Sequence, residues 1–360
     1  MNNRLGRVVF ALLVIATATS AQERGGEDET GPYQIVENWL QPVHPGWYHH
    51  ATGVYAESPN RILISASGET PIPETKPGER RSGASIKGFD PKRPGAKADH
   101  FLIVVDGNGR ILEEWTQLLK LAVRPHSVTE NPYDPDKHVW IIDREGQQVI
   151  ELSHDGKSVV MTIGEKGVAG VDEKHFNRPA NMAFLPDGSF FVADGYINTR
   201  IIKFDKNGKY LTQWGNPGSG PGEFNLVHCV AVDAQGRVYV ADRSNGRIQV
   251  FDSKGKYLEE WRSRRPTFLM VTQDQSLWVA DSQADRILKY DLNGKLLTYW
   301  GVNGTFPGAM DDPHSFSVDS DGNLYVVDYN NNRVQKYRPR PGADPKRLIG
   351  QPYRAKGNDD

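Results

Sequence analysis

The 360-residue chain contains a single cysteine, Cys229, so it has no second thiol with which to form an internal disulfide. Neither sign of charge predominates, because 43 Lys and Arg stand against 45 Asp and Glu, for a formal net charge of −2. This balance gives no reason to expect nucleic acid as a partner. The N-terminal apolar run over 8–15 is much shorter than the roughly 20 residues that span a bilayer. We therefore expect no membrane span in the mature chain.

The first 21 residues have the organisation of a secretory signal peptide. Arg4 and Arg7 form a basic start, the apolar run follows, and small residues lead to Ala21. We predict a signal peptide over 1–21 and a linker over 22–34. The mature chain is accordingly expected to be secreted or periplasmic.

A repeated unit fills most of the remaining chain. Five copies contain an aliphatic strand that ends in an aspartate, at Asp143, Asp194, Asp242, Asp281 and Asp328, with steps of 51, 48, 39 and 47 residues. A third strand, a Gly-containing turn and a fourth strand follow, as in antiparallel hairpins. A four-stranded unit that recurs every ~40–50 residues is typical of a propeller blade. The aspartates are expected to bond turn backbone and not to be catalytic.

A sixth unit precedes these five copies. Its strands are expected at 52–54, 61–65, 101–105 and 111–115. A long insertion rich in Pro, Gly, Lys and Arg separates the second strand from the third, over about 68–100, and is expected to be a mobile loop. The segment 35–39 resembles the fourth strands and is expected to complete the last blade, leaving no free sheet edge. The predicted fold is all-β, a six-bladed β-propeller with four-stranded antiparallel blades over 35–345, followed by a C-terminal tail over 346–360.

Three histidines occur at matching places in alternate copies of the unit. They are His126, His228 and His314, each near the start of an inner strand. Alternate blades of a six-membered ring lie roughly 120° apart, so the three imidazoles are expected to converge on the axis. Neutral imidazoles suit zinc, and three protein ligands leave a position open for a substrate. Their nearest ring nitrogens are then expected within roughly 3–4.5 Å of one another.

The remaining histidines have no counterpart in the repeat, and loop or surface positions are expected for them. They are His44, His49, His50, His100, His138, His154 and His175. Cys229 follows His228 directly and is expected to be a small buried filler. The two side chains point to opposite faces if this strand is regular.

Several motifs beside the second strands resemble a known family. Residues 193–200 read Ala-Asp-Gly-Tyr-Ile-Asn-Thr-Arg, and residues 241–249 read Ala-Asp-Arg-Ser-Asn-Gly-Arg-Ile-Gln. Together with Gln-Trp-Gly at 213–215 and Pro-Gly-Glu-Phe at 221–224, they resemble the peptidyl-α-hydroxyglycine α-amidating lyases, which are six-bladed propellers of the NHL-repeat type. The resemblance covers roughly 54–337.

This resemblance implies a lyase that breaks the C–N bond of a peptidyl-α-hydroxyglycine to give a peptide amide and glyoxylate. It implies that His126, His228 and His314 hold zinc, a Lewis acid that lowers the pKa of a bound hydroxyl. Tyr196 corresponds to the tyrosine thought to act as the base, and Arg243 corresponds to an active-site arginine. A small peptide-like substrate and a monomeric chain are expected.

A structural calcium ion is also implied by the resemblance, on the backbone carbonyls at the positions of Val54 and Val128. The family's carboxylate ligand to this ion, immediately after the third histidine, is replaced by Ser315. Since calcium sites rely on carboxylates, calcium is the weaker of the two metal expectations.

Two further departures concern the active site. A methionine of the family is Asp312 in this chain, and the first-blade segment 65–68 contains no arginine where the family has one. Arg80 or Arg81, in the insertion, is the substitute that the sequence offers.

Two other functions stay open on the sequence alone. The first is a non-catalytic extracytoplasmic NHL propeller that binds a peptide, glycan or protein partner and needs neither metal nor Tyr196. The second is a zinc enzyme acting on a lactone or phosphate ester, for which no nucleophile motif is present. The ordinary alternatives for single residues are packing for each histidine, a rim phenol for Tyr196 and a structural ion pair for Arg243, which shares its loop position with Arg144.

Overall fold

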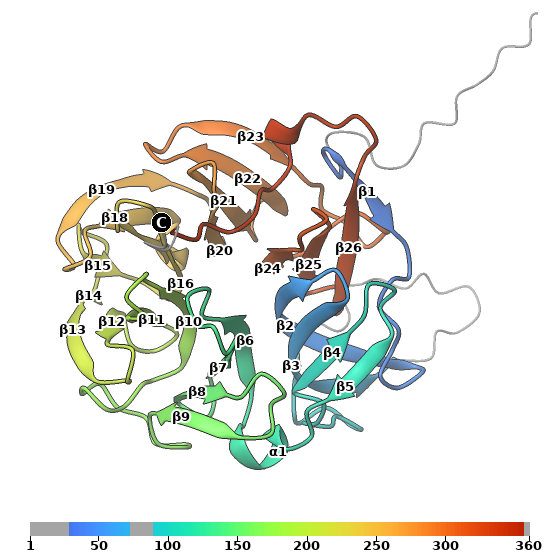
Figure 1. Cartoon of the computed structure of the whole chain (residues 1–360), viewed down its shortest axis with the longest axis horizontal. Coiled ribbons are helices and arrows are strands. Elements are labelled where there is room, and N and C mark those ends of the chain that lie inside the picture. Colours follow the sequence, from blue (N-terminus) through green and yellow to red (C-terminus); the bar gives the residue numbers. More distant parts are fainter. Residues whose placement is uncertain (1–28, 73–88, 356–360) are drawn as a thin grey trace, which may run out of the picture.

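Six four-stranded antiparallel sheets surround a central axis in the computed structural model, which describes residues 29–72 and 89–355 (Figure 1). The predicted all-β, six-bladed propeller is thereby confirmed. The predicted signal peptide, Arg80 and Arg81 lie outside the described residues. The one α-helix of the described part is the four-residue α1 (Leu118–Leu121), between the first two blades.

The strands of the first three blades, from the axis outward, are β2 (Trp47–Ser58), β3 (Arg61–Pro71), β4 (Leu102–Val105) and β5 (Ile111–Glu114); β6 (Pro125–Glu130), β7 (Val139–Asp143), β8 (Gln148–Leu152) and β9 (Val159–Ile163); and β10 (Pro179–Phe184), β11 (Phe190–Asp194), β12 (Arg200–Phe204) and β13 (Tyr210–Trp214). Those of the last three are β16 (Val227–Val232), β17 (Val238–Asp242), β18 (Arg247–Phe251) and β19 (Tyr257–Arg262); β20 (Pro266–Val271), β21 (Ser276–Asp281), β22 (Arg286–Asp291) and β23 (Leu296–Trp300); and β24 (Pro313–Val318), β25 (Leu324–Asp328), β26 (Arg333–Pro339) and β1 (Tyr33–Val36). A short parallel ribbon joins β14 (Asn216–Pro217) and β15 (Glu223–Phe224), and 3-10 turns cover Arg243–Asn245 and Pro345–Arg347.

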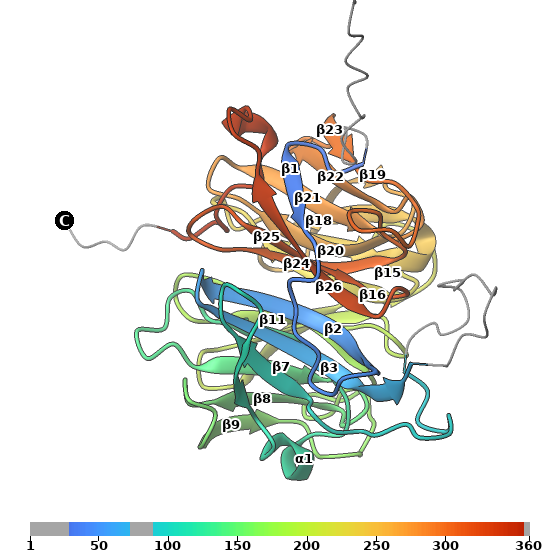
Figure 2. The same cartoon turned by 90° about the vertical axis from the view of Figure 1, so that its right-hand side faces the viewer.

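Strand β1 closes the ring, as predicted for the segment 35–39. It pairs antiparallel with β26, with Ile35 opposite Tyr337, and the two strands lie side by side in Figures 1 and 2. The strand begins two residues earlier than expected and ends at Val36. Trp39 lies beyond it, where its Nε1 donates to the carbonyl of Gly107 in the first blade at 3.0 Å. The N-terminal segment therefore contacts both blades at the closure.

The first blade carries a hairpin longer than the sequence indicated. Strands β2 and β3 continue past the expected ends, so that His49 lies opposite Glu69 and Trp47 lies opposite Pro71. An isolated bridge joins Glu69 to Lys97 on the returning chain. The interpretation of 68–98 as a loop is therefore wrong for its first residues, because main-chain pairing extends the sheet there. Residues 73–88 lie outside the described part.

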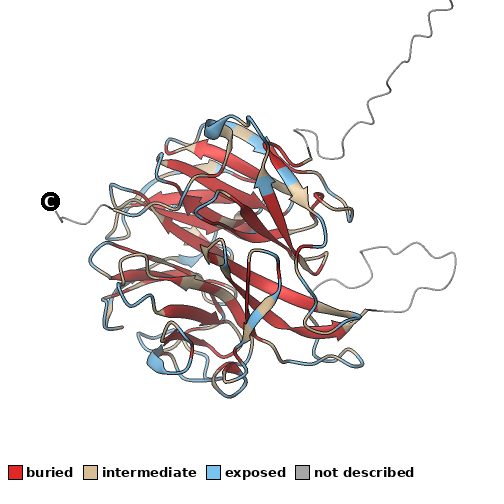
Figure 3. Cartoon of the chain, turned by 45° about the vertical axis from the view of Figure 1, so that its right-hand side comes forward, coloured by how far each residue is buried: buried red, intermediate tan, exposed pale blue. Residues whose placement is uncertain are grey.

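The core lies between the blades and not within one layer. In blades two to six the second strand is buried along its whole length, and the other middle strands are largely buried, as the red strands of Figure 3 show, because neighbouring blades cover both faces of every sheet. Trp278, Trp300 and Tyr337 pack in one such layer, between the fifth and sixth blades. The starts of the inner strands are consequently held in fixed positions around the axis.

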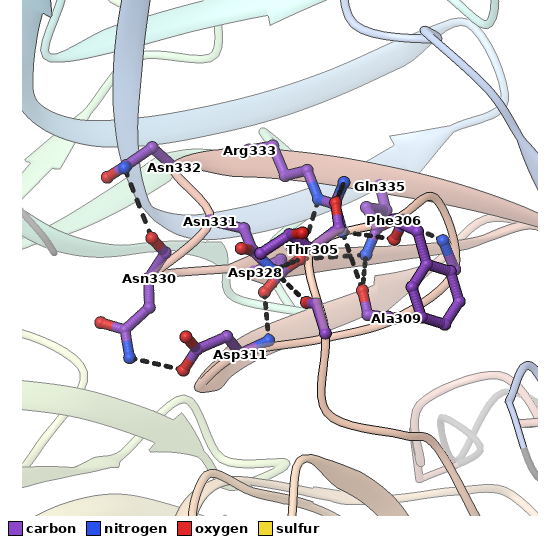
Figure 4. A network of polar contacts seen from close by, with 12 residues as sticks. Thr305, Phe306, Ala309, Asp311, Asp328, Asn330, Asn331, Asn332, Arg333 and Gln335 are labelled. Carbon is purple, nitrogen blue, oxygen red and sulfur yellow. Dashed lines mark hydrogen bonds and ion pairs between the residues drawn. The ribbon is translucent and has the colours of Figure 1, made fainter. Parts of the chain in front are cut away.

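The aspartates that end the second strands fix the loops leading into the inner strands. Asp328 has no exposed surface; its Oδ1 accepts from the backbone N–H of Asp311 at 2.7 Å, and its Oδ2 accepts from Asn331, Arg333 and Gln335 at 2.8–3.1 Å (Figure 4). The other four accept from the backbone N–H groups of Arg124, Asn177, Asn225 and Arg265. These bonds agree with the expected structural role of the aspartates. They also extend beyond the turns predicted from the sequence, because they reach the loops that lead into the inner strands.

The C-terminal residues pack onto the propeller up to residue 355. Ile349 donates its backbone N–H to the Tyr33 hydroxyl at 2.8 Å, and Tyr353 donates its own to the carbonyl of Val271 at 2.8 Å. Residues 352–354 thereby cover one end of the central axis.

Candidate metal centre

Each of the three aligned histidines stands at a β-bulge. The register between the first two strands of the blade shifts around His126, His228 and His314. A bulge leaves one residue without a partner and redirects its side chain, which accounts for three rings aimed at one point. The same bulge falls at Ala180 in the third blade and at Thr267 in the fifth.

The three imidazoles converge on the axis of the propeller. Their ring centroids are 5.0, 4.8 and 4.9 Å apart, and one nitrogen from each ring lies within 4.8 Å of the others. All three side chains are buried, at 2–5 % exposure. This separation is close to the span expected for ligands of a single zinc ion.

Hydrogen bonds across the blade gaps fix which ring nitrogen faces the axis. The Nδ1 atoms of His126, His228 and His314 lie 2.7, 2.6 and 2.6 Å from the carbonyl oxygens of Ala180, Thr267 and Thr52. Because a carbonyl only accepts, each Nδ1 carries the proton and each Nε2 presents a lone pair. Backbone carbonyls of this kind commonly orient metal-ligating histidines.

The surroundings of these histidines keep them neutral. Burial lowers the pKa of all three, and for His314 to about 3, with the positive charge of Arg243 acting in the same direction. The neutral imidazole is the form that binds a metal ion. The site is therefore ready to coordinate without first losing protons.

The hydroxyl of Tyr196, in the loop after β11, contacts two of the three histidines. It lies 3.0 Å from Nε2 of His126 and 2.9 Å from Nε2 of His228. The guanidinium of Arg144 covers the Tyr196 ring, 4.8 Å from its centroid. The hydroxyl thus projects to the same face as the three histidines.

Arg243 lies on another side of the site. Its Nη2 is 4.0 Å from Oδ2 of Asp312, and its charge acts mainly on His228 and His314. Burial raises the pKa of Asp312, although Arg243 and Arg265 oppose this shift. The structure therefore places an acidic group beside the arginine on which the family resemblance relies.

Two residues of the site were not identified as site residues from the sequence. Arg144 covers Tyr196, and the ring of Tyr329 stacks on His314 with centroids 5.2 Å apart and an interplanar angle of 28°. Both directly follow a blade aspartate, as Arg243 does. The position after that aspartate therefore marks the rim of the site, a signal that the sequence contains.

Further along the same inner strands, the axis continues into a cavity of about 180 Å³. Val54 and Val128, whose carbonyls are the expected calcium ligands, lie in its wall, as does Ser315. The carboxylates in the wall are those of Glu130 and Asp233, near the end covered by the C-terminal residues. Cys229 is buried beside the cavity wall, where its thiol accepts the backbone N–H of Leu269. Calcium stays a prediction.

The expectation of loop or surface positions is wrong for two other histidines. His49 and His50 are 7 % and 1 % exposed, because the extended β2 carries them into the first blade. His138, His154 and His175 are partly exposed and pair with carboxylates, as expected near the surface.

Comparisons with known proteins agree with this architecture. Residues 171–264 match a family model described as a 6-bladed beta-propeller, and residues 310–337 match an NHL repeat. Peptidyl-glycine alpha-amidating monooxygenase A of Xenopus laevis is 32% identical over 266 residues, which are 66% of this chain and 27% of that protein. A probable peptidyl-alpha-hydroxyglycine alpha-amidating lyase of Caenorhabditis elegans is 36% identical over 130 residues, 35% of this chain and 36% of that one.

The fold alone is shared with virginiamycin B lyase from Staphylococcus aureus, at a TM-score of 0.52 and 13% identity over 86% of this chain and 90% of that one. Within the described residues, no helix has the length and hydropathy of a membrane span. The sequence matches reach only part of the relatives' length. Fold, repeat and sequence matches together confirm the resemblance: the chain is a six-bladed NHL-repeat propeller homologous to proteins named as peptidyl-α-hydroxyglycine α-amidating lyases.

Proposed function

We propose that this chain cleaves peptidyl-α-hydroxyglycine into a peptide amide and glyoxylate. The observation that carries the proposal is the Tyr196 hydroxyl, 3.0 and 2.9 Å from two Nε2 atoms of the three-histidine set. A phenol at that point lies beside any hydroxyl bound by the same histidines, within reach of its proton. The named relatives support the reaction class.

The three-histidine set fits zinc. Three neutral imidazoles present unprotonated Nε2 atoms to one point, their Nδ1 protons are engaged by backbone carbonyls, and no fourth protein ligand is needed for a catalytic site. We assign His126, His228 and His314 as the ligands. Bound zinc supplies Lewis acidity that lowers the pKa of a substrate hydroxyl. Calcium on the carbonyls of Val54 and Val128 is a weaker proposal, for want of a carboxylate at Ser315.

Tyr196 moves the proton in the proposed reaction. Its phenolate accepts the proton of the substrate α-hydroxyl, the C=O bond of glyoxylate forms, and the C–N bond breaks. The amide nitrogen leaves with the bonding electrons and takes up one proton, so the proton held by Tyr196 balances the reaction. Arg144, 4.8 Å from the ring centroid, stabilises the phenolate form by its positive charge.

Two arginines can hold the substrate carboxylate. Arg243 matches the family position, and Arg144, from the second blade, supplies the second cation that the first blade lacks. Charge-assisted hydrogen bonds from guanidinium groups suit a carboxylate. Asp312 is a local competitor for Arg243.

The cellular setting is proposed from the sequence. Residues 1–21 have the features of a signal peptide, which favours a secreted or periplasmic enzyme. The proposed substrate is a small peptide-like molecule, and the proposed active unit is the monomer.

The proposal is tested by glyoxylate release from zinc-loaded protein. Tyr196→Phe is expected to lower turnover roughly 10²–10⁴-fold while zinc content is unchanged, because only the proton-transfer group is lost. Tyr210→Phe, in the outer strand β13, is the matched control and should keep full activity. Absence of release by the wild type across a panel of peptidyl-α-hydroxyglycines would reject the lyase and leave the binding module.

A further inference from the structure

A second group of metal-ligating side chains lies around strand β3 of the first blade, outside the three-histidine site. Glu69, on β3, has a side chain with 0 % exposure. Nδ1 of His44 is 2.7 Å from its Oε2, and Nδ1 of His100 is 3.3 Å from the same oxygen. One ligand atom from each of the three residues lies within 4.8 Å of the others. Figure 2 shows the long β2 and β3 strands, the second of which includes Glu69.

Within the part of the chain that the structure describes, neither lysine nor arginine pairs with the Glu69 carboxylate. Within the described chain, its ion-pair contacts are all with histidines: His44, His100 and His49, whose Nδ1 is 3.4 Å from Oε1. A buried carboxylate is costly unless a cation compensates it, and a divalent metal ion held by two imidazoles provides that charge.

His100 has the arrangement that orients a metal ligand. Its Nε2 lies 3.2 Å from Oε2 of Glu114 and its Nδ1 lies 3.3 Å from Oε2 of Glu69, so the distal nitrogen has a carboxylate acceptor while Nδ1 faces the group. A carboxylate that accepts from the distal nitrogen is the usual support of a metal-bound histidine. Oδ1 of Asp99 is 3.4 Å from the same Nδ1 and offers a further oxygen.

The frame around the group is rigid and open on one side. Glu69 and Lys97 exchange two backbone hydrogen bonds of 2.8 and 2.9 Å. The rings of His44 and His100 are 5.0 Å apart, which is the spacing found in the axial three-histidine set, and Trp47 contacts His44 at 5.9 Å. His44 is 39 % exposed and gives an ion a path from solvent.

We propose that His44, Glu69 and His100 form a second site for a divalent transition-metal ion, with zinc as the ion to test first. The donor set of two imidazoles and one carboxylate suits such ions better than calcium or magnesium. Bound there, the ion joins three segments distant in sequence: the connection before β2, strand β3 and the segment before β4. His49 then orients the Glu69 carboxylate. This site is independent of the proposed lyase reaction.

The first test is zinc stoichiometry after removal of weakly bound metal by dialysis. Wild type is expected to retain about two zinc ions per chain, and His44→Ala about one. The protein with His126, His228 and His314 all changed to alanine is expected to retain about one, which His44→Ala then removes. Since His44 is partly exposed, its replacement leaves the fold intact, as circular dichroism of the zinc-free protein will check.

Two further variants separate a metal site from a simple ion-pair cluster. Glu114→Gln replaces the charged acceptor behind His100 with a neutral amide and should weaken zinc binding at this site roughly 10–100-fold. His175→Ala is the matched control, because His175 pairs with Asp172 at 2.9 Å without a second histidine, and it should leave stoichiometry unchanged. Equal zinc content in wild type and His44→Ala would overturn the proposal. Glyoxylate release is measured separately, so the lyase proposal stands or fails on its own.

Discussion

Asp328 offers a direct test of the loop clamp at the sixth blade. Asp328→Ala removes the acceptor of four hydrogen bonds, one from the backbone of Asp311 and three from side chains, including the 2.8 Å ion pair with Arg333. Breaking a buried charge pair by removing one partner costs about 3–5 kcal/mol. The four bonds belong to one network and their contributions do not add, so the same range is expected for the whole change.

The measurement is chemical denaturation of the zinc-free protein at pH 7.5, so that metal binding does not mask the loss. Asp205→Ala is the matched control, because the partly exposed Asp205 carboxylate accepts from two backbone N–H groups of its own turn, both at 2.9 Å, and its loss should cost about 1 kcal/mol. Equal losses in the two variants would refute the view that burial and the charged partner make the blade aspartates structural anchors.

Two further predictions concern titration and substrate affinity. Burial, together with the charge of Glu57, raises the pKa of Glu130 from 4.5 to about 7, so the native state favours the protonated acid. The stabilisation that comes from protonated Glu130 is full below pH 4.5 and is lost as the pH rises to 7. Between pH 4 and 8, the free energy of unfolding of Glu130→Gln should therefore increase by up to about 3 kcal/mol relative to that of the wild type. Parallel denaturation profiles of the two proteins would contradict this. Asp312→Asn should lower the KM for a peptidyl-α-hydroxyglycine by about tenfold with kcat unchanged. The reason is that the Asp312 carboxylate, 4.0 Å from Arg243, competes with the substrate carboxylate for that arginine. A higher KM in steady-state assays would contradict this.

The fold was predictable because the same residue types recur at the same places in successive copies of the sequence repeat. In five blades the second strand ends in an aspartate, and in the five blades whose fourth strand comes next in the chain a glycine turn follows the third strand; these signals define the blades without knowledge of the packing between them. The bridge from Glu69 on β3 to Lys97 was not predictable in this way, because Lys97 lies beyond a long insertion. Local pattern does not reveal a pairing that depends on chain return over such a distance.

The site was predictable only where it follows the repeat. His126, His228 and His314 were found because they recur in alternate blades. Arg144 lies in an equivalent loop position, but only the structure shows that it covers the Tyr196 ring. The group around Glu69 has no counterpart in other blades, and its histidines come from both sides of the insertion, so no sequence period connects them.

The axial metal centre depends on closure of the ring. Nδ1 of His314, in the last blade, donates to the carbonyl of Thr52 in the first blade at 2.6 Å, across the seam where the chain closes. The Thr52 hydroxyl in turn donates to the carbonyl of Pro125 at 3.1 Å, the residue before His126. Two of the three ligands are therefore oriented through one first-blade residue. Since β1 completes the sixth blade at this seam, the same closure that removes the free sheet edge also sets the geometry of the ligands.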